Sequence, residues 1–242
     1  MKRNGKQELC TGLLLLAGFA LWTGLIQRVD VQPVGLGGTE VGFASLNLRF
    51  HELTGVHMTL YTVTDWLGLA PVFLCLVFAG LGFAQLVKRR SLFKVDPDIL
   101  LLGVYYILVI LGYLIFEMIP INFRPVLIEG RMEASYPSST TLLVLSVMPA
   151  VCFQAKRRIK NGSMKRGAVT ASVLFTLFMV FGRTVAGVHW LTDIIGSVIL
   201  SAGLYLTYRA GVDLFEHKTM AEREAIPWNL ARSCRNCEKA ED

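Results

Sequence analysis

Six stretches of apolar sequence without charged residues alternate with polar segments along the chain. Four of them are long enough to cross a hydrocarbon core of roughly 30 Å as α-helices. The last two are shorter because a polar segment interrupts them, and extending each into that segment restores a full span. We therefore expect spans at about residues 9–27, 66–87, 99–119, 138–155, 167–186 and 188–208. This pattern predicts an all-α integral membrane protein, a six-transmembrane helix bundle formed by residues 1–209, with a charged tail at 210–242.

The basic residues are distributed unevenly over the connecting segments. Most of the 24 Lys and Arg lie at the N-terminus, between spans two and three, between spans four and five, and after span six. The others fall on the opposite side: Arg28, Arg49, Arg124, Arg131 and Arg183. Because cytoplasmic loops are enriched in Lys and Arg, we expect a plasma-membrane protein with both termini in the cytoplasm. The net charge of +6 is then explained by topology and by contact with membrane lipids, and no nucleic-acid partner is needed.

The segment that interrupts the last two spans contains three ionisable side chains, Arg183, His189 and Asp193. Charged groups at membrane depth are costly and indicate a functional site. If the last helix starts near residue 188, His189 and Asp193 are four residues apart on its first turn, where the carboxylate can orient the imidazole. An oriented neutral imidazole can act as a nucleophile. Arg183 carries donors suited to phosphate oxygens. The alternative is an interfacial Arg–Asp pair with an uninvolved histidine.

Two further polar segments lie on the same predicted side, where the active-site loops would be extracytoplasmic. Arg124 and Pro125 follow span three, and Pro137, Ser138 and Ser139 open span four. A serine at the start of a helix can cap it, and the free amides of that end favour an anion. Read alone, this second segment is ordinary helix capping.

These three segments together resemble the type 2 phosphatidic acid phosphatase superfamily, which also includes vanadium haloperoxidases. Its motifs are K-x6-RP, PSGH and SR-x5-H-x3-D. The resemblance implies that His189 is a nucleophile forming a phosphohistidine, that Asp193 orients it, and that the phosphate is bound by a group of four residues: Arg124, Ser138, Ser139 and Arg183. It implies no cofactor and no metal.

The chain departs from these motifs at four positions. Glu117 stands in place of the motif Lys, Ser139 in place of Gly, Thr140 in place of the second-motif His, and Gly182 in place of Ser. The resemblance implies that the missing His protonates the leaving group, and a threonine hydroxyl cannot replace it near neutral pH. Glu117 either removes a useful cation or, when protonated, serves as the replacement acid.

The missing acid bears on the substrate. A lipid phosphomonoester must expel an alkoxide, whose conjugate acid is about as weak as water at ~15.7, whereas a diphosphate expels a phosphomonoester with a second pKa of about 6. We therefore expect a membrane phosphatase that hydrolyses an isoprenoid diphosphate, such as undecaprenyl diphosphate, or a related lipid phosphate. The alternative is a catalytically impaired protein that binds or transports lipid phosphates. Six spans and the absent acid disfavour haloperoxidase chemistry.

Two other features of the sequence are weaker indications of function. Phe43, Leu46, Phe50 and Leu53 recur at helical spacing between the first two spans, which predicts a short helix at the membrane interface. It would be either a lid for lipid entry or a segment packed over the bundle. Cys234 and Cys237 form a lone C-x2-C pair in the tail, which favours reduced, solvated thiols.

Overall fold

The computed structural model describes residues 4–225, and within them the chain is helical, with isolated bridges but no β-strand. In order, the elements are α1 (Gly5–Ile26), η1 (Leu36–Gly38), α2 (Ala44–Thr54), α3 (Met58–Leu67), α4 (Leu69–Arg89), η2 (Leu92–Lys94), α5 (Pro97–Met118), α6 (Ser139–Arg158), α7 (Gly162–Val185) and α8 (Leu191–Ala225). Six helical regions of this part are long and apolar enough to cross a membrane, counting α3 and α4 as one. The predicted all-α, multi-pass fold is therefore confirmed.

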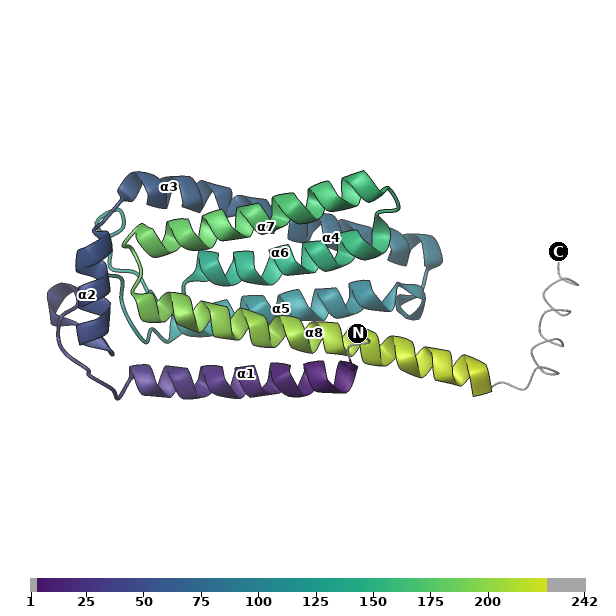
Figure 1. Cartoon of the computed structure of the whole chain (residues 1–242), viewed down its shortest axis with the longest axis horizontal. Helices are drawn as coiled ribbons and strands as arrows, with labels where there is room; N and C mark the ends of the chain where they lie inside the picture. Colours follow the sequence, from purple (N-terminus) through teal and green to yellow (C-terminus); the bar gives the residue numbers. More distant parts are fainter. Residues whose placement is uncertain (1–3, 226–242) are drawn as a thin grey trace, which may run out of the picture.

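The long helices lie side by side along the longest axis of the molecule (Figure 1). α2 lies across one end of this bundle, where the α5–α6 and α7–α8 connections also lie (Figure 1). The α4–α5 and α6–α7 connections lie at the other end. The three polar segments of the sequence are thus brought to the α2 end, which we call the site end.

α1 packs along α8 through small residues. A Cβ atom added to Gly12 would lie 2.7 Å from Thr207 Oγ1, and one added to Gly203 would lie 2.9 Å from Leu16 Cδ2. Small residues let membrane helices approach closely enough for extensive van der Waals contact. This close packing fixes α8, whose first turn contributes to the site.

A buried aromatic group anchors the segment before α6. The Tyr136 ring stacks on Phe19 at 6.0 Å and meets Phe116 edge to face at 5.4 Å. Its hydroxyl lies 2.8 Å from Thr23 Oγ1, and a Cβ atom on Gly196 would lie 2.5 Å from the ring. Tyr136 therefore binds the start of α6 to α1, α5 and α8, and it fixes the neighbouring serines.

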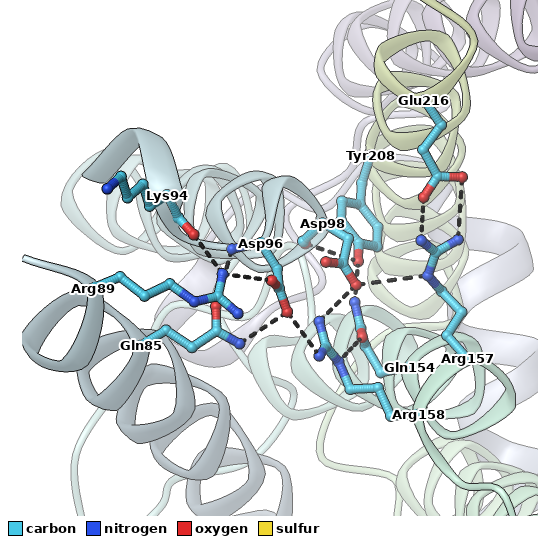
Figure 2. A network of polar contacts seen from close by, with 10 residues as sticks. All are labelled: Gln85, Arg89, Lys94, Asp96, Asp98, Gln154, Arg157, Arg158, Tyr208 and Glu216. Carbon is cyan, nitrogen blue, oxygen red and sulfur yellow. Dashed lines mark hydrogen bonds and ion pairs between the residues drawn. The ribbon is translucent and has the colours of Figure 1, made fainter. Parts of the chain in front are cut away.

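At the opposite end, charges of alternating sign connect four helices (Figure 2). The order is Arg89, Asp96, Arg158, Asp98, Arg157 and Glu216, drawn from α4, the residue before α5, α5, α6 and α8. Arg158 lies 2.8 Å from Asp98 and 3.2 Å from Asp96. A shared network of this kind orders the helix ends more than isolated surface pairs would. The basic residues that dominate this end are thus partly neutralised within the fold.

Several helix limits differ from the sequence prediction. The predicted short helix between the first two spans is present as α2. The second span begins earlier than expected, at Met58, and is broken at Gly68, which would meet Thr140 if it carried a Cβ atom. α8 continues past residue 209 to Ala225, and Ala210 and Val212 are buried, so no break marks the predicted start of the tail. Cys234 and Cys237 lie outside the described residues.

The charge distribution predicts which end faces the cytoplasm. Glu40→Cys at the site end should react with a membrane-impermeant maleimide in intact cells, and Lys160→Cys at the opposite end should react only after lysis. Both residues are exposed, and Lys160 spares Asn161, whose side chain caps α7. The background carries serine at Cys234 and Cys237. The opposite labelling pattern would reverse the orientation.

Candidate active site

His189 lies in the short connection between α7 and α8. α8 begins at Leu191, so the prediction of a start near residue 188, with His189 on the first turn, is wrong. The physical reason is Gly187, which has a φ of +68° and leaves no room for a side chain, since a Cβ atom would lie 1.9 Å from the Gly55 carbonyl oxygen. The turn at Gly187 ends α7 and places His189 before the helix.

Asp193 occupies the first turn of α8 and is completely buried. Its Oδ2 accepts the Trp190 amide at 2.9 Å and the Ser135 hydroxyl, and its Oδ1 accepts the Asn122 amide nitrogen at 3.3 Å. Accepting the N–H of the residue before the helix is the role of the acidic residue in a capping box. Asp193 thus joins the α5–α6 connection, the segment before α6 and the start of α8.

The imidazole of His189 contacts Asp193 only indirectly. Its Nδ1 lies 3.9 Å from Asp193 Oδ2, too far for a hydrogen bond. Both the hydroxyl and the carbonyl oxygen of Ser135 lie 3.1 Å from Nδ1. Because the Ser135 hydroxyl donates to Asp193, it can accept only from an N–H at Nδ1. The arrangement therefore favours the tautomer with the proton on Nδ1 and a free lone pair on Nε2.

The surroundings of His189 keep it neutral. Burial, and after it the positive charges of Arg124 and Arg183, hold the pKa of His189 well below its ordinary value, against a smaller opposite effect of the Ser135 carbonyl. Since the pKa is lowered, the ring remains unprotonated at neutral and mildly acid pH. Neutral imidazole is the nucleophilic form.

Two arginines meet over one aromatic ring. The Cζ atom of Arg183, in the last turn of α7, lies 4.8 Å from the centre of the Tyr61 ring of α3, and that of Arg124 lies 5.7 Å from it. The electron-rich face of an aromatic ring attracts cations. Tyr61 therefore offsets part of the repulsion between two buried guanidinium groups, of which Arg183 is 1% exposed.

Arg124 is presented by a tight hairpin in the α5–α6 connection. Ile128 and Arg131 exchange backbone hydrogen bonds across Glu129 and Gly130, which both have positive φ, as a type I′ turn requires. The Arg124 amide donates to the Glu133 carbonyl at 3.1 Å, and its guanidinium lies 3.3 Å from the Glu133 carboxylate. The hairpin thus turns Arg124 back over the bundle.

Several nitrogens at this point are buried and have no hydrogen-bond partner among the described residues. They are Nη1 of Arg124, Nε and Nη1 of Arg183, and Nε2 of His189. Arg183 Nη1 is 3.5 Å from Asp65, an ion contact without hydrogen-bond geometry. Buried polar atoms without protein partners are costly, so these nitrogens are expected to bind a water molecule, an ion or a ligand. Cationic donors beside a lone pair fit an anion with an electrophilic centre, such as phosphate. In residues 4–225, no group of three His, Cys, Asp or Glu is placed to hold a metal.

The second polar segment, at Pro137, Ser138 and Ser139, lies beside this site, but its serine does not act as a simple helix cap. Ser138 precedes α6, yet its hydroxyl donates to Thr141 Oγ1 and makes no capping bond to the backbone. Ser138 is tied to α8 through its carbonyl, which accepts the Ser197 hydroxyl. Ser139 lines a small cavity shared with Glu117 and His189.

Thr140 lines a different and larger cavity. It has a volume of about 510 Å³ and lies among α4, α5 and α6, with mostly apolar walls that include Val72, Val109 and Leu142. Asp65 and Ser139 also line it. Glu117 and Thr140, the two candidates for substituted roles, are thus found on separate cavities that share Ser139 and Tyr113.

One departure from the family motif has a packing explanation. A Cβ atom at Gly182 would lie 2.8 Å from the Thr64 methyl group of α3. A serine at this position would therefore push α3 away from α7. The glycine lets α3 approach closely enough to bring Tyr61 over Arg183.

Sequence reasoning missed four residues of the site: Tyr61, Asp65, Asn122 and Ser135. Tyr61 and Asp65 are four residues apart on α3, in a stretch that was read as part of the loop before span two. Asn122 and Ser135 are small polar residues beside the motifs. Their side-chain partners are distant in the sequence, so no spacing rule could identify them.

The comparisons with known proteins agree with this geometry. The model of the PAP2 superfamily matches residues 99–214. Among solved structures, a transmembrane PAP2 type phosphatidylglycerolphosphate phosphatase from Bacillus subtilis is similar, with a TM-score of 0.58 and 18% identity, over 86% of this chain and 96% of that chain. No curated protein matches the chain.

The fold and the site together define a multi-pass helical membrane protein with a buried histidine and two arginines at one end of the bundle. The resemblance seen in the sequence is confirmed by the match of residues 99–214 to the PAP2 superfamily model. This region includes Arg124, Ser138, Arg183, His189 and Asp193, whereas Tyr61 and Asp65 lie before it.

The position of Tyr61 predicts its contribution to anion binding. Tyr61→Leu should weaken inorganic phosphate binding roughly 2- to 30-fold, as expected for the loss of about 0.5–2 kcal/mol of cation–π attraction. Titration calorimetry of the purified protein in detergent measures this. Tyr61→Phe keeps the ring and should bind nearly as wild type. Equal losses in both variants would assign the effect to the hydroxyl group.

Proposed function

We propose that this protein is a lipid phosphatase that hydrolyses an isoprenoid diphosphate, or a related lipid phosphate, through a phosphohistidine at His189. The PAP2 superfamily region and the structural similarity to a membrane phosphatase support phosphatase activity in general. We also propose that the site end faces the outside of the plasma membrane, as the basic residues at the opposite end suggest.

The observation that carries the proposal is the free, buried Nε2 of His189 beside the unpartnered nitrogens of two arginines. Structural histidines use both ring nitrogens or expose one to water. Here Ser135 holds the Nδ1 proton, so the lone pair of Nε2 is directed away from Ser135 and remains available. A phosphate bound by Arg124 and Arg183 would bring phosphorus to this lone pair.

The reaction would proceed in two displacements. In the first, Nε2 of His189 forms a bond to the terminal phosphorus, and the bond from phosphorus to the bridging oxygen breaks, with its electron pair leaving on the lipid monophosphate. In the second, a water oxygen bonds to phosphorus, the N–P bond breaks, and the electron pair returns to Nε2. Arg124 and Arg183 neutralise the charge that develops on the phosphoryl oxygens.

The apolar cavity is the proposed binding site for the lipid. Its walls come from α4, α5 and α6, and its polar end is formed by Asp65, Ser139 and Thr140. A volume of about 510 Å³ holds only the first part of a long lipid tail, and the rest would extend into the bilayer. The leaving group would therefore depart towards Thr140.

The preference for diphosphate follows from the side chain at this position. Thr140 cannot protonate a departing alkoxide, but a departing phosphomonoester needs no proton. Glu117 lines the small cavity on the His189 side, where it can donate a proton only if it is itself protonated. We therefore expect faster hydrolysis of diphosphates than of phosphomonoesters.

The central test is phosphate release by the purified protein from polyprenyl diphosphate, diacylglycerol pyrophosphate and phosphatidate in parallel. His189→Ala should abolish turnover, because it removes the nucleophile. Asp193→Asn should retain part of it, because the amide oxygen can still accept from Ser135 and Trp190 while only the Asn122 amide loses its acceptor.

His57→Ala is the matched control, since His57 is exposed at the same end and lies outside the site. Its turnover should equal that of wild type. Phosphate binding without turnover in the wild type, unaffected by His189→Ala, would identify a lipid-phosphate binding protein instead.

A second test concerns the missing acid. Thr140→His should raise phosphomonoester hydrolysis more than diphosphate hydrolysis, by up to ~10²–10⁴-fold, the usual contribution of general acid catalysis. The imidazole has room only on the cavity side, because Gly68 packs on the Thr140 methyl group. Initial rates on both substrates measure the change, with Glu117→Gln alone and in combination. An unchanged ratio of the two rates would refute this account of the preference.

A further inference from the structure

Asp65 occupies a position between the anion site and the apolar cavity. It lies in the last turn of α3, outside the region that matches the superfamily. Its carboxylate is 3.5 Å from Nη1 of Arg183, and the same residue lines the cavity together with Ser139 and Thr140. Asp65 thus contacts the guanidinium that would bind phosphate and also borders the space into which the leaving group would depart.

The break between α3 and α4 holds Asp65 there. The Gly68 amide donates to the carbonyl oxygens of Thr64 and Asp65, each at 3.0 Å, and closes the last turn of α3. Gly68 itself packs against Thr140, where a Cβ atom would lie 3.3 Å from the methyl group. The backbone of this turn therefore fixes Asp65 next to position 140, which lacks the imidazole found in the superfamily motif.

The contact with Arg183 leaves both groups available. It lacks hydrogen-bond geometry, so Arg183 can bind a phosphoryl oxygen without losing a hydrogen bond. A bound phosphoryl oxygen would lie roughly 2.7–2.9 Å from Nη1 of Arg183. The Asp65 side chain is 55% exposed, so water reaches the carboxylate. A water molecule that enters after the leaving group departs would meet this carboxylate at the end of the cavity.

We propose that Asp65 is the general base for hydrolysis of the phosphohistidine, an inference that rests on the proposed function. In this step the water oxygen attacks phosphorus from the side that the leaving group has vacated, opposite Nε2 of His189. One water proton passes to the Asp65 carboxylate, the N–P bond breaks, and its electron pair returns to Nε2. The inorganic phosphate leaves, and Asp65 then releases the proton to bulk water.

With this assignment, the two displacements require different catalytic groups. A diphosphate needs no acid in the first one, because its leaving group departs as an anion. The second needs a base, and a carboxylate that water can reach at the end of the cavity can accept a proton from the attacking water. The chain thus lacks the histidine that the resemblance assigns to protonation of the leaving group, but it retains a group for the step that a diphosphate still requires.

The experiment separates formation of the phosphoenzyme from its hydrolysis. Wild type, Asp65→Asn, Asp65→Glu and Asp65→Ala in detergent are mixed with polyprenyl diphosphate labelled in its terminal phosphate, and acid-labile label on the protein is followed by rapid quench. Asp65→Asn should form phosphoenzyme within about 3-fold of the wild-type rate, while its hydrolysis slows by ~10²–10⁴-fold, the usual contribution of a general base. The labelled protein should then accumulate.

Two further variants test the chemistry of the carboxylate. Asp65→Glu should recover part of the hydrolysis rate, and added formate should accelerate hydrolysis in Asp65→Ala by supplying a carboxylate in the vacated space. Glu52→Gln is the matched control, because it removes one exposed negative charge from α2 at the same end and should behave as wild type.

The outcomes distinguish failure of this inference from failure of the proposed function. If wild type forms no phosphoenzyme, or His189→Ala still forms it, the phosphohistidine mechanism itself is wrong. If phosphoenzyme forms but Asp65→Asn hydrolyses it at the wild-type rate, Asp65 is not the base. If Asp65→Asn slows only the formation step, Asp65 acts on Arg183 or on substrate binding, and the inference is likewise overturned.

Discussion

The buried carboxylate of Asp193 is the interaction on which the site depends. It accepts hydrogen bonds from Asn122 and Ser135, at the two ends of the α5–α6 connection, and from Trp190, just before α8. A buried charge without partners costs far more than the gain from any single hydrogen bond. The segments must therefore assemble together around it, and the orientation of His189 follows from their assembly. In the superfamily resemblance this residue only orients the histidine, whereas here it also holds the loops together.

Electrostatic balance limits what else the site can contain. Two buried guanidinium groups repel each other, and the fold offsets this with the Tyr61 ring and with carboxylates at the edge, Asp65 and Glu133. None of these contacts uses the full hydrogen-bonding capacity of the arginines. An anion bound to these free nitrogens would further offset the repulsion between the two arginines and would stabilise the folded protein. Burial of His189, and after it the positive charges of these two arginines, lowers the pKa of the imidazole.

The helix bundle could be predicted from the sequence because the bilayer sets the length of each apolar run and excludes charged residues from it. These properties depend little on how the helices pack. The segments with Arg124, Ser138 and His189 could be assigned to one end for the same reason. The start of α8 could not be predicted, since it depends on the close approach of Gly187 to Gly55. The position of the Ser135 hydroxyl between His189 and Asp193 could not be predicted either. Only tertiary packing decides whether a carboxylate reaches a histidine directly.

The interruption at Gly68 divides the second span into two parts with different neighbours. Its outer part, α3, faces α7 and supplies Tyr61, Thr64 and Asp65 to the site end, whereas α4 presents large apolar side chains such as Phe73 and Phe83 on its exposed surface. Bilayers differ in thickness, and a helix responds to mismatch by tilting or bending at a small free-energy cost per ångström. Gly68 keeps a helical φ and ψ and a hydrogen bond to the Thr64 carbonyl, so a tilt of α4 would also act on α3. Because α4 also lines the apolar cavity, the thickness of the surrounding bilayer is expected to influence the shape of that cavity.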